Sequence, residues 1–353
     1  MEFYYKKNSK NRIYALDSLK GIMIFSIVLF HLPEWLHGFP NILSFAYNKG
    51  GDYGNAFFFM VSGFTLSLTY SERIQQIAFK DFLKKRVLKV YVLYIVTDIA
   101  QMIFEIVTKG IEVINIRDII LNLTMTTSGW IENIYPYNIA TWFFSVLLLD
   151  YILFFIISKY GKNNKYYLYI IALIIGMIIQ KTNLNYLFLY YHNGEAYTPF
   201  FIGCLLSKAL IDSKKHIKLI FPLTALTICF IILTAFNGFD KAAGTWKYVW
   251  YFVVCPMIIL VSIDVKIINK ILSLKPVVFC LGGISTYIFF WHGPFMNYFV
   301  YLKIKSLMGL STDGFILFYL PVLIIFCNLY KFFEQKISNW FQTCKNQKAI
   351  EME

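Results

Sequence analysis

Residues 139–158 read IATWFFSVLLLDYILFFIIS, and this stretch decides the fold class. It carries one charged residue, Asp150, among aliphatic and aromatic side chains. A helix of about 20 mostly apolar residues is long enough to cross the hydrocarbon core of a bilayer. We therefore expect residues 139–158 to form a transmembrane helix.

Runs of the same kind recur along the chain on both sides of this stretch. The fold class predicted from them is all-α, a polytopic integral membrane protein with about ten transmembrane helices. The ten predicted spans cover residues 19–37, 53–71, 88–108, 139–158, 166–181, 196–211, 218–236, 247–265, 277–302 and 312–333.

The composition of the 353 residues agrees with a membrane protein. Hydrophobic residues make up 58% and charged residues 15%, against roughly 25% charged residues in soluble domains. Such a chain has too few polar side chains to cover a surface facing water, which argues against a soluble enzyme, a nucleic-acid binder or a disordered scaffold. The six cysteines form no C-x-x-C pair, so we expect neither a metal site nor a disulfide framework.

The distribution of basic residues predicts the orientation. With ten spans and a cytoplasmic N-terminus, 25 of the 33 Lys and Arg residues fall on the inner side, as the positive-inside rule requires. The polar-interrupted stretch 113–130 is then a half-inserted or interfacial element on the outer side. We expect one transmembrane domain over residues 1–340 and a short cytoplasmic tail over residues 341–353, with both termini cytoplasmic.

The first predicted span carries the most informative polar residues. Lys20 and His31 are eleven residues apart, which places them within about 20° of one helix face and roughly 16 Å apart along its axis. An ionisable residue inside a span is costly and marks a functional candidate. Glu34, one turn further, could hold or polarise the His31 ring. The alternative is structural, with His31 as an interhelical hydrogen-bonding residue and Lys20 extending to the interface.

Three further segments contain candidate residues. Ser62 precedes Gly63 in the second span, where small residues permit close approach of a helix or a ligand. A basic loop leads into the third span and could bind either anionic lipid headgroups or a phosphate-rich cytosolic cofactor. The ninth span adds a second histidine, His292, and Trp142 heads the fourth span. The loop runs from Phe79 to Tyr91 and contains Lys84, Lys85, Arg86 and Lys89.

Four motifs in order resemble those of acyltransferase family 3, whose members are membrane O-acyltransferases of carbohydrates. The opening of the family resembles Arg12, Leu16, Asp17, Leu19, Lys20 and Gly21 followed by His31, and its F-F-x-x-S-G-F motif resembles residues 58–64. Its F-x-x-x-R-x-x-R signature is similar to Phe82, Arg86 and Lys89, and its S-x-Y-x-x-x-x-H segment to Ser285, Tyr287 and His292.

The chain departs from the family pattern in three places. Lys20 and Lys89 each replace an arginine, which keeps the charge but loses the bidentate geometry that a guanidinium offers to phosphate. The W-S-L-x-x-E pattern of some members is absent, since the position five residues after Trp142, where the acid would stand, is Leu147. No carboxylate partner of His31 is therefore taken from that motif.

The resemblance implies transfer of an acyl group, acetyl in most members, from cytosolic acyl-CoA to a sugar hydroxyl. His31 is then the expected catalytic base, because an alcohol needs a base near neutral pH. The expected partners are acyl-CoA, with acetyl-CoA as the donor substrate, a carbohydrate or lipid-linked sugar as the acceptor, and membrane lipids. We expect neither a metal nor a nucleic acid to bind. A homo-oligomer is compatible with this function. The expected donor-binding residues are Arg12, Lys20, Lys84, Lys85, Arg86 and Lys89, and those expected to contact the substrate are Glu34, Ser62, Trp142 and His292.

A second function is compatible with the same residues. A ten-span protein in the plasma or inner membrane could export or flip a glycan or a lipid-linked sugar, with aromatic rings stacking on the sugar. Paired discontinuous helices would favour transport, and the sequence shows no such pairing. Dependence on an acyl-CoA donor separates the two functions.

Overall fold

The computed structural model describes residues 12–32, 44–70, 73–131, 134–182, 184–212 and 245–350. These residues are mostly helical, with no strand among them, so the all-α prediction is confirmed for the described part of the chain. The helices of its first half are α1 (Tyr14–Phe30), α2 (Ser44–Tyr70), η3 (Ile74–Gln76), α3 (Phe79–Lys109), η4 (Ile111–Val113), α4 (Ile116–Leu123), η5 (Ile139–Thr141), α5 (Trp142–Tyr160), η6 (Lys162–Asn164), α6 (Lys165–Thr182) and α7 (Tyr191–Asp212).

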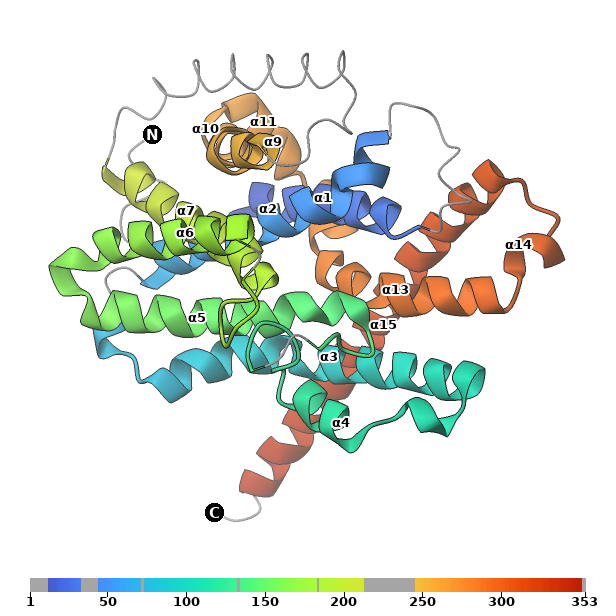
Figure 1. The fold of residues 1–353 in the computed structure, drawn as a ribbon. Coiled ribbons are helices and arrows are strands. Elements are labelled where there is room, and N and C mark those ends of the chain that lie inside the picture. The colour runs from blue at the N-terminus through green and yellow to red at the C-terminus, as the bar shows by residue number, and fades with distance from the viewer. Residues whose placement is uncertain are drawn as a thin grey trace.

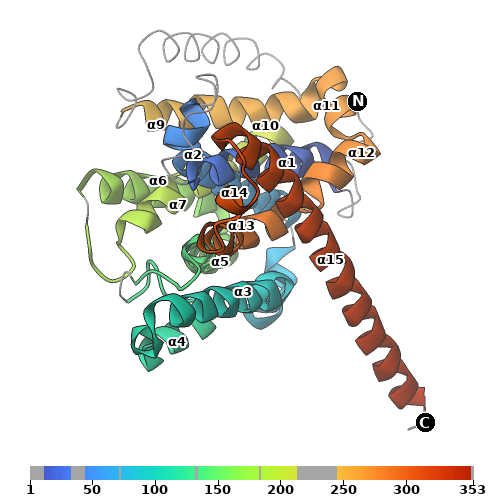
Figure 2. The same ribbon diagram turned by 90° about the vertical axis from the view of Figure 1, so that its right-hand side faces the viewer.

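The second half adds shorter helices and one very long one. α15 passes obliquely beside the other helices, and its C-terminal end projects beyond them in both views (Figures 1 and 2). The helices are α9 (Thr245–Val249), η8 (Trp250–Val254), α10 (Cys255–Asp264), α11 (Lys266–Leu272), α12 (Lys275–Val277), η9 (Val278–Gly282), α13 (Ser285–Tyr301), α14 (Ile304–Leu307) and α15 (Thr312–Ile350).

Five segments of the described chain are long and apolar enough to cross a membrane. They are Phe79–Lys109, Ile139–Tyr160, Lys162–Thr182, Lys247–Asp264 and Gly314–Ile337, and each overlaps a predicted span. The predicted span 218–236 lies outside the described residues. The count of ten spans and the orientation of the termini stay predictions, as do the 1–340 domain and the tail, although α15 continues to Ile350.

Two segments differ from the sequence-based prediction. The basic stretch from Phe79 to Tyr91 is not a loop but the first turns of α3, because it contains neither Gly nor Pro and its Lys, Arg and Leu residues favour a helix. The predicted span 277–302 is divided, since the π-helical η9 and two glycines precede α13.

The stretch 113–130 contains only the eight-residue α4, which is too short to cross a bilayer.

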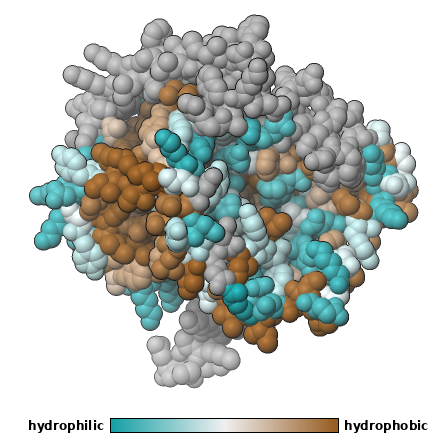
Figure 3. Space-filling view, viewed as in Figure 1, coloured by the Kyte–Doolittle hydropathy of each residue, from teal (hydrophilic) through white to brown (hydrophobic). Residues whose placement is uncertain are grey.

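The side-chain distribution fits a bundle surrounded by lipid. Phenylalanines such as Phe57, Phe64 and Phe200 are completely buried where α2 and α7 pack. Isoleucines on α6, such as Ile171 and Ile178, are half exposed, and an apolar patch is visible on the side of the molecule where α6 lies (Figure 3). An exposed apolar helix face is stable in contact with acyl chains but not with water.

Helices α2 and α7 approach at backbone distance because each has a glycine at the contact. A Cβ atom on Gly63 would collide with the Phe200 carbonyl, and one on Gly203 would collide with the Met60 carbonyl. Small residues at a helix crossing allow such an approach inside a membrane. This pair fixes α2, which carries Ser62, against the core.

Replacing either glycine by alanine should destabilise the bundle, because the new methyl group meets backbone rather than a flexible side chain. For Gly63→Ala and Gly203→Ala we expect a loss of about 1–3 kcal/mol of unfolding free energy, measured by thermal unfolding in detergent. Gly293→Ala is the matched control, since the nearest atom to its Cβ would be Asn138 Oδ1 at 3.6 Å. Equal stability of all three variants would contradict this packing.

Candidate functional site

Two histidines from opposite ends of the chain meet in the bundle. His31 is the C-terminal residue that caps α1, and His292 lies in the middle of α13. His292 Nε2 is 3.3 Å from His31 Nδ1, and the ring centroids are 5.0 Å apart. His31 is exposed, whereas His292 is only 3% exposed. The pair therefore consists of one accessible imidazole and one buried imidazole behind it.

The hydrogen bonds of the pair determine where the protons sit. His292 Nδ1 is 2.7 Å from the carbonyl oxygen of Phe289, which can only accept, so Nδ1 carries the proton. In neutral His292 the Nε2 atom is then an acceptor. His31 Nδ1 faces both this nitrogen and the carbonyl oxygen of Ile27 at 2.9 Å, so it must also be protonated. Neutral His31 is left with an unprotonated Nε2, which is the form a general base needs.

Neighbouring polar groups hold α13 in place around His292. Tyr319 of α15 donates a hydrogen bond to the His292 carbonyl at 3.0 Å. The Asn138 side-chain amide donates a hydrogen bond to the Phe290 carbonyl at 2.9 Å, and the Asn138 backbone N–H donates one to the Asp98 carboxylate at 3.0 Å. These bonds fix the orientation of the buried ring, which in turn orients His31.

The start of α1 packs against η9 at backbone distance. A Cβ atom on Gly21 would collide with the backbone of Leu281, and one on Gly282 would collide with the backbone of Asp17. Only glycine allows this approach from both sides. Because η9 leads into α13, the contact also sets the register between the helices that carry His31 and His292.

Cations gather at the end of α1 opposite His31. Asp17 accepts from Arg12 Nε at 2.5 Å and from Lys20 Nζ at 3.5 Å. Lys89 of α3 is close enough to repel the charge of Lys20, and Arg12 acts in the same way on Lys331 of α15. Three helices thus bring four cations to one end of the site. Lys331 was not among the residues expected from the sequence.

The remaining basic residues of α3 do not form one group. Lys84 and Lys85 are exposed on the first turns of the helix. The Arg86 guanidinium instead lies 4.9 Å from the centre of the Tyr70 ring, and its Nε is buried with no hydrogen-bond partner among the described residues. The helical conformation causes this division, because successive residues point about 100° apart.

Ser62 lies with Arg86 rather than with the histidines. Ser62 is within hydrogen-bonding reach of the hydroxyl group of Tyr151 on α5. The same hydroxyl group interacts electrostatically with Arg86. Asp150, the neighbour of Tyr151, is completely buried, and neither carboxylate oxygen has a hydrogen-bond partner among the described residues. The structure therefore groups Ser62 with a polar cluster inside the bundle.

Trp142 also lies away from the histidine pair. Its ring stacks on His192 of α7, with centroids 4.3 Å apart and planes inclined by 28°. The sequence analysis did not predict His192 as a site residue. Glu195, three positions further along the chain, is the sequence feature that indicates a paired histidine here. Glu34, expected as a partner of His31, lies outside the described residues; His292 is the side chain found at hydrogen-bonding distance from the His31 ring.

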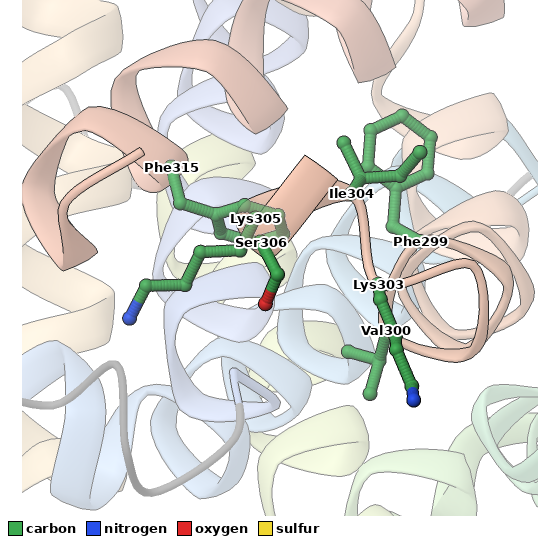
Figure 4. A pocket seen from close by; sticks show the side chains of 7 residues that line it. All are labelled: Phe299, Val300, Lys303, Ile304, Lys305, Ser306 and Phe315. Carbon is green, nitrogen blue, oxygen red and sulfur yellow. The ribbon is translucent and has the colours of Figure 1, made fainter. Parts of the chain in front are cut away.

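A cavity of roughly 240 Å³ lies where α13, α14 and α15 meet. Figure 4 shows that the amino groups of its two lysines point in different directions. None of the residues expected from the sequence lines this cavity, so it is not the site at the histidine pair. Its lining residues are Phe299, Val300, Lys303, Ile304, Lys305, Ser306 and Phe315.

Comparison with known proteins identifies a family. The model of acyltransferase family 3, described as an acyltransferase domain, matches residues 13–341, nearly the whole chain. No curated protein and no solved structure matches the chain. The matched range begins directly before α1 and ends within α15, so it contains both histidines and three of the four cations at the other end of α1, Lys20, Lys89 and Lys331.

The arrangement of protons in the histidine pair can be tested by ¹⁵N NMR of the protein labelled at its five histidines. We expect His31 to carry its proton on Nδ1, whereas a free imidazole prefers Nε2, because Nδ1 faces two acceptors. His31→Gln and His292→Gln assign the signals, and His216→Gln is the control. A proton on His31 Nε2 in the neutral protein would contradict the assignment.

Proposed function

The chain belongs to acyltransferase family 3, and on that premise we propose that it transfers an acyl group, acetyl in the first instance, from cytosolic acyl-CoA to a carbohydrate hydroxyl. The acceptor is a cell-envelope or extracellular polysaccharide or its lipid-linked precursor, and the protein resides in the plasma or inner membrane. The observation that carries the proposal is that His31 Nδ1 lies within hydrogen-bonding distance of the Ile27 carbonyl and of His292 Nε2, which assigns the basic lone pair to His31 Nε2, at the end of α1 away from the group of cations.

The proposed reaction uses His31 as the base. Nε2 takes the proton of the acceptor hydroxyl while the hydroxyl oxygen attacks the thioester carbonyl carbon. The C–S bond breaks, and the CoA sulfur leaves as a thiolate that receives the proton from the His31 imidazolium. During the step, His31 Nδ1–H stays directed at the Ile27 carbonyl and at His292 Nε2, and both acceptors stabilise the positive charge.

The proposed donor site is the cationic end of α1. Arg12, Lys20 and Lys89, with Lys331 beside them, offer charge-assisted hydrogen bonds to the phosphates of CoA. Eleven residues of helix separate Lys20 from His31, or roughly 16 Å at 1.5 Å per residue. An extended pantetheine arm laid along α1 would carry the thioester from the cations to the base.

Loss of the base should abolish transfer without abolishing donor binding. We expect His31→Ala to lower the rate about 10²–10⁴-fold, the usual contribution of a positioned general base. The measurement is base-labile radioactivity in the carbohydrate fraction after inverted membrane vesicles receive labelled acetyl-CoA. His37→Ala, with expression matched, is the control. An unchanged rate in His31→Ala would remove His31 from the mechanism.

Loss of the cations at the start of α1 should weaken donor binding. For Lys20→Ala/Lys89→Ala/Lys331→Ala we expect the affinity for acetyl-CoA in calorimetry to fall about tenfold or more, since hydrogen bonds to charged groups contribute roughly 1.5–3 kcal/mol each. Lys303→Ala/Lys305→Ala is the control at the other end of the bundle. Failure of the folded wild type to bind acetyl-CoA or succinyl-CoA would instead favour a glycan exporter.

A further inference from the structure

A second group of polar residues lies around the start of α7, outside the histidine pair. His192 Nδ1 is 3.1 Å from Glu195 Oε2, and His192 Nε2 is 3.2 Å from the hydroxyl oxygen of Tyr135. The carboxylate requires a proton on Nδ1, so in neutral His192 the Nε2 atom accepts the hydrogen bond of Tyr135. We call His192, Glu195 and Tyr135 the α7 triad.

The Trp142 ring packs against one face of the α7 triad. It is 9% exposed and stacks on the His192 ring, so the imidazole cannot swing away from Glu195 without losing this contact. Glu195 and His192 themselves are each less than one-fifth exposed. The triad is therefore a rigid, partly buried set of hydrogen-bonding groups rather than a mobile surface pair.

Charges of both signs surround the α7 triad. Asp52 of α2 and Lys247 of α9 each interact electrostatically with Glu195 and with one another. The Lys247 amino group lies 5.6 Å from the centre of the Tyr191 ring and 5.4 Å from that of Tyr248. The opposing charges favour an uncharged ligand that both donates and accepts hydrogen bonds. Among the described residues, no group of three His, Cys, Asp or Glu side chains is placed to hold a metal ion.

Aromatic surface is available next to these polar groups. Tyr135 is 55% exposed, and Tyr191, which precedes His192, is 36% exposed. Their rings offer apolar faces, while the Tyr135 hydroxyl is a polar contact at the edge of the triad. Apolar ring faces beside carboxylates fit a molecule with C–H bonds on one face and hydroxyl groups at its edge, which describes a pyranose ring.

We propose that the α7 triad, with Asp52 and Lys247, binds a neutral sugar unit of the acceptor at a distance from the hydroxyl that is acylated. This inference rests on the proposed function, which makes the acceptor a carbohydrate. Glu195 and Asp52 accept hydrogen bonds from neighbouring sugar hydroxyl groups, and the Tyr135 hydroxyl oxygen, held in place by its hydrogen bond to His192 Nε2, accepts a further one.

A row of aromatic rings links the α7 triad to the histidine pair. Beyond Trp142, which stacks on His192, come Phe143 at 6.3 Å, then Phe289 at 5.1 Å from Phe143, then His292 at 6.1 Å from Phe289. Three packed aromatic rings, Trp142, Phe143 and Phe289, thus lie between His192 and the histidine pair. An acceptor of several sugar units would occupy both at once.

The test is binding of neutral sugars to the purified protein, detected by saturation-transfer NMR with glucose, galactose, N-acetylglucosamine and their β1,4-linked disaccharides as probes. We expect at least one probe to bind the wild type and His31→Ala alike. Glu195→Gln should weaken that binding about tenfold, the effect of losing a charge-assisted hydrogen bond, and Tyr135→Phe should also weaken it. Glu112→Gln and Tyr167→Phe are the matched controls at exposed positions.

Acetyl-CoA binding by the same samples separates the two proposals. A protein that binds acetyl-CoA but no neutral sugar, or that binds sugar equally well after Glu195→Gln and Tyr135→Phe, overturns the α7 site and leaves the acyltransferase proposal intact. Binding of glucuronate alone would also overturn it, because the ligand would then be acidic. A folded protein that binds sugar but not acetyl-CoA overturns the donor half of the proposed function and leaves the sugar site standing.

Discussion

The backbone contact between α1 and η9 governs the geometry on which the site depends. Gly21 and Gly282 each lie where a single methyl group would strike the opposite backbone. In a membrane, helices gain little from burying apolar area against one another, so close packing and interhelical hydrogen bonds decide how they associate. This contact holds the start of α1 against the segment that leads into α13. The distance from there to His31 on one helix and to His292 on the other then follows from helical geometry alone.

The two ends of α1 therefore carry different chemistry on one rigid element. Arg12 and Lys20 are held by Asp17 at one end, while His31 caps the other. A helix keeps these groups at a constant separation, which suits a donor whose charged part and reacting part are themselves far apart. Buried His292 contributes no surface of its own, and its effect passes through the orientation of the His31 ring.

The sequence predicted much of this arrangement, and its omissions have physical causes. Helical periodicity was sufficient to relate Lys20 to His31, because both lie on one continuous helix. The contact between His31 and His292 joins residues 261 positions apart and could not be read from either helix alone. The basic stretch of α3 was expected to be a loop because its charge density is typical of a segment outside the membrane, but its Lys, Arg and Leu residues favour a helix there as well. His192 and Glu195 lie in the first turn of α7, outside the predicted span 196–211, and the stacking of His192 on Trp142 joins two different helices, so neither helix alone indicates it.

The glycine contact between α1 and η9 also bears on which changes of chain length the protein can tolerate. One residue inserted between Gly282 and His292 would turn the imidazole about 100° around the axis of α13 and remove it from His31. An insertion in the connection between α14 and α15 would leave that register untouched, because both histidines precede it. Ten residues separate Gly282 from His292, and ten separate Gly21 from His31. Both spacings are therefore fixed, because a deletion or duplication within either stretch would separate the two imidazole rings.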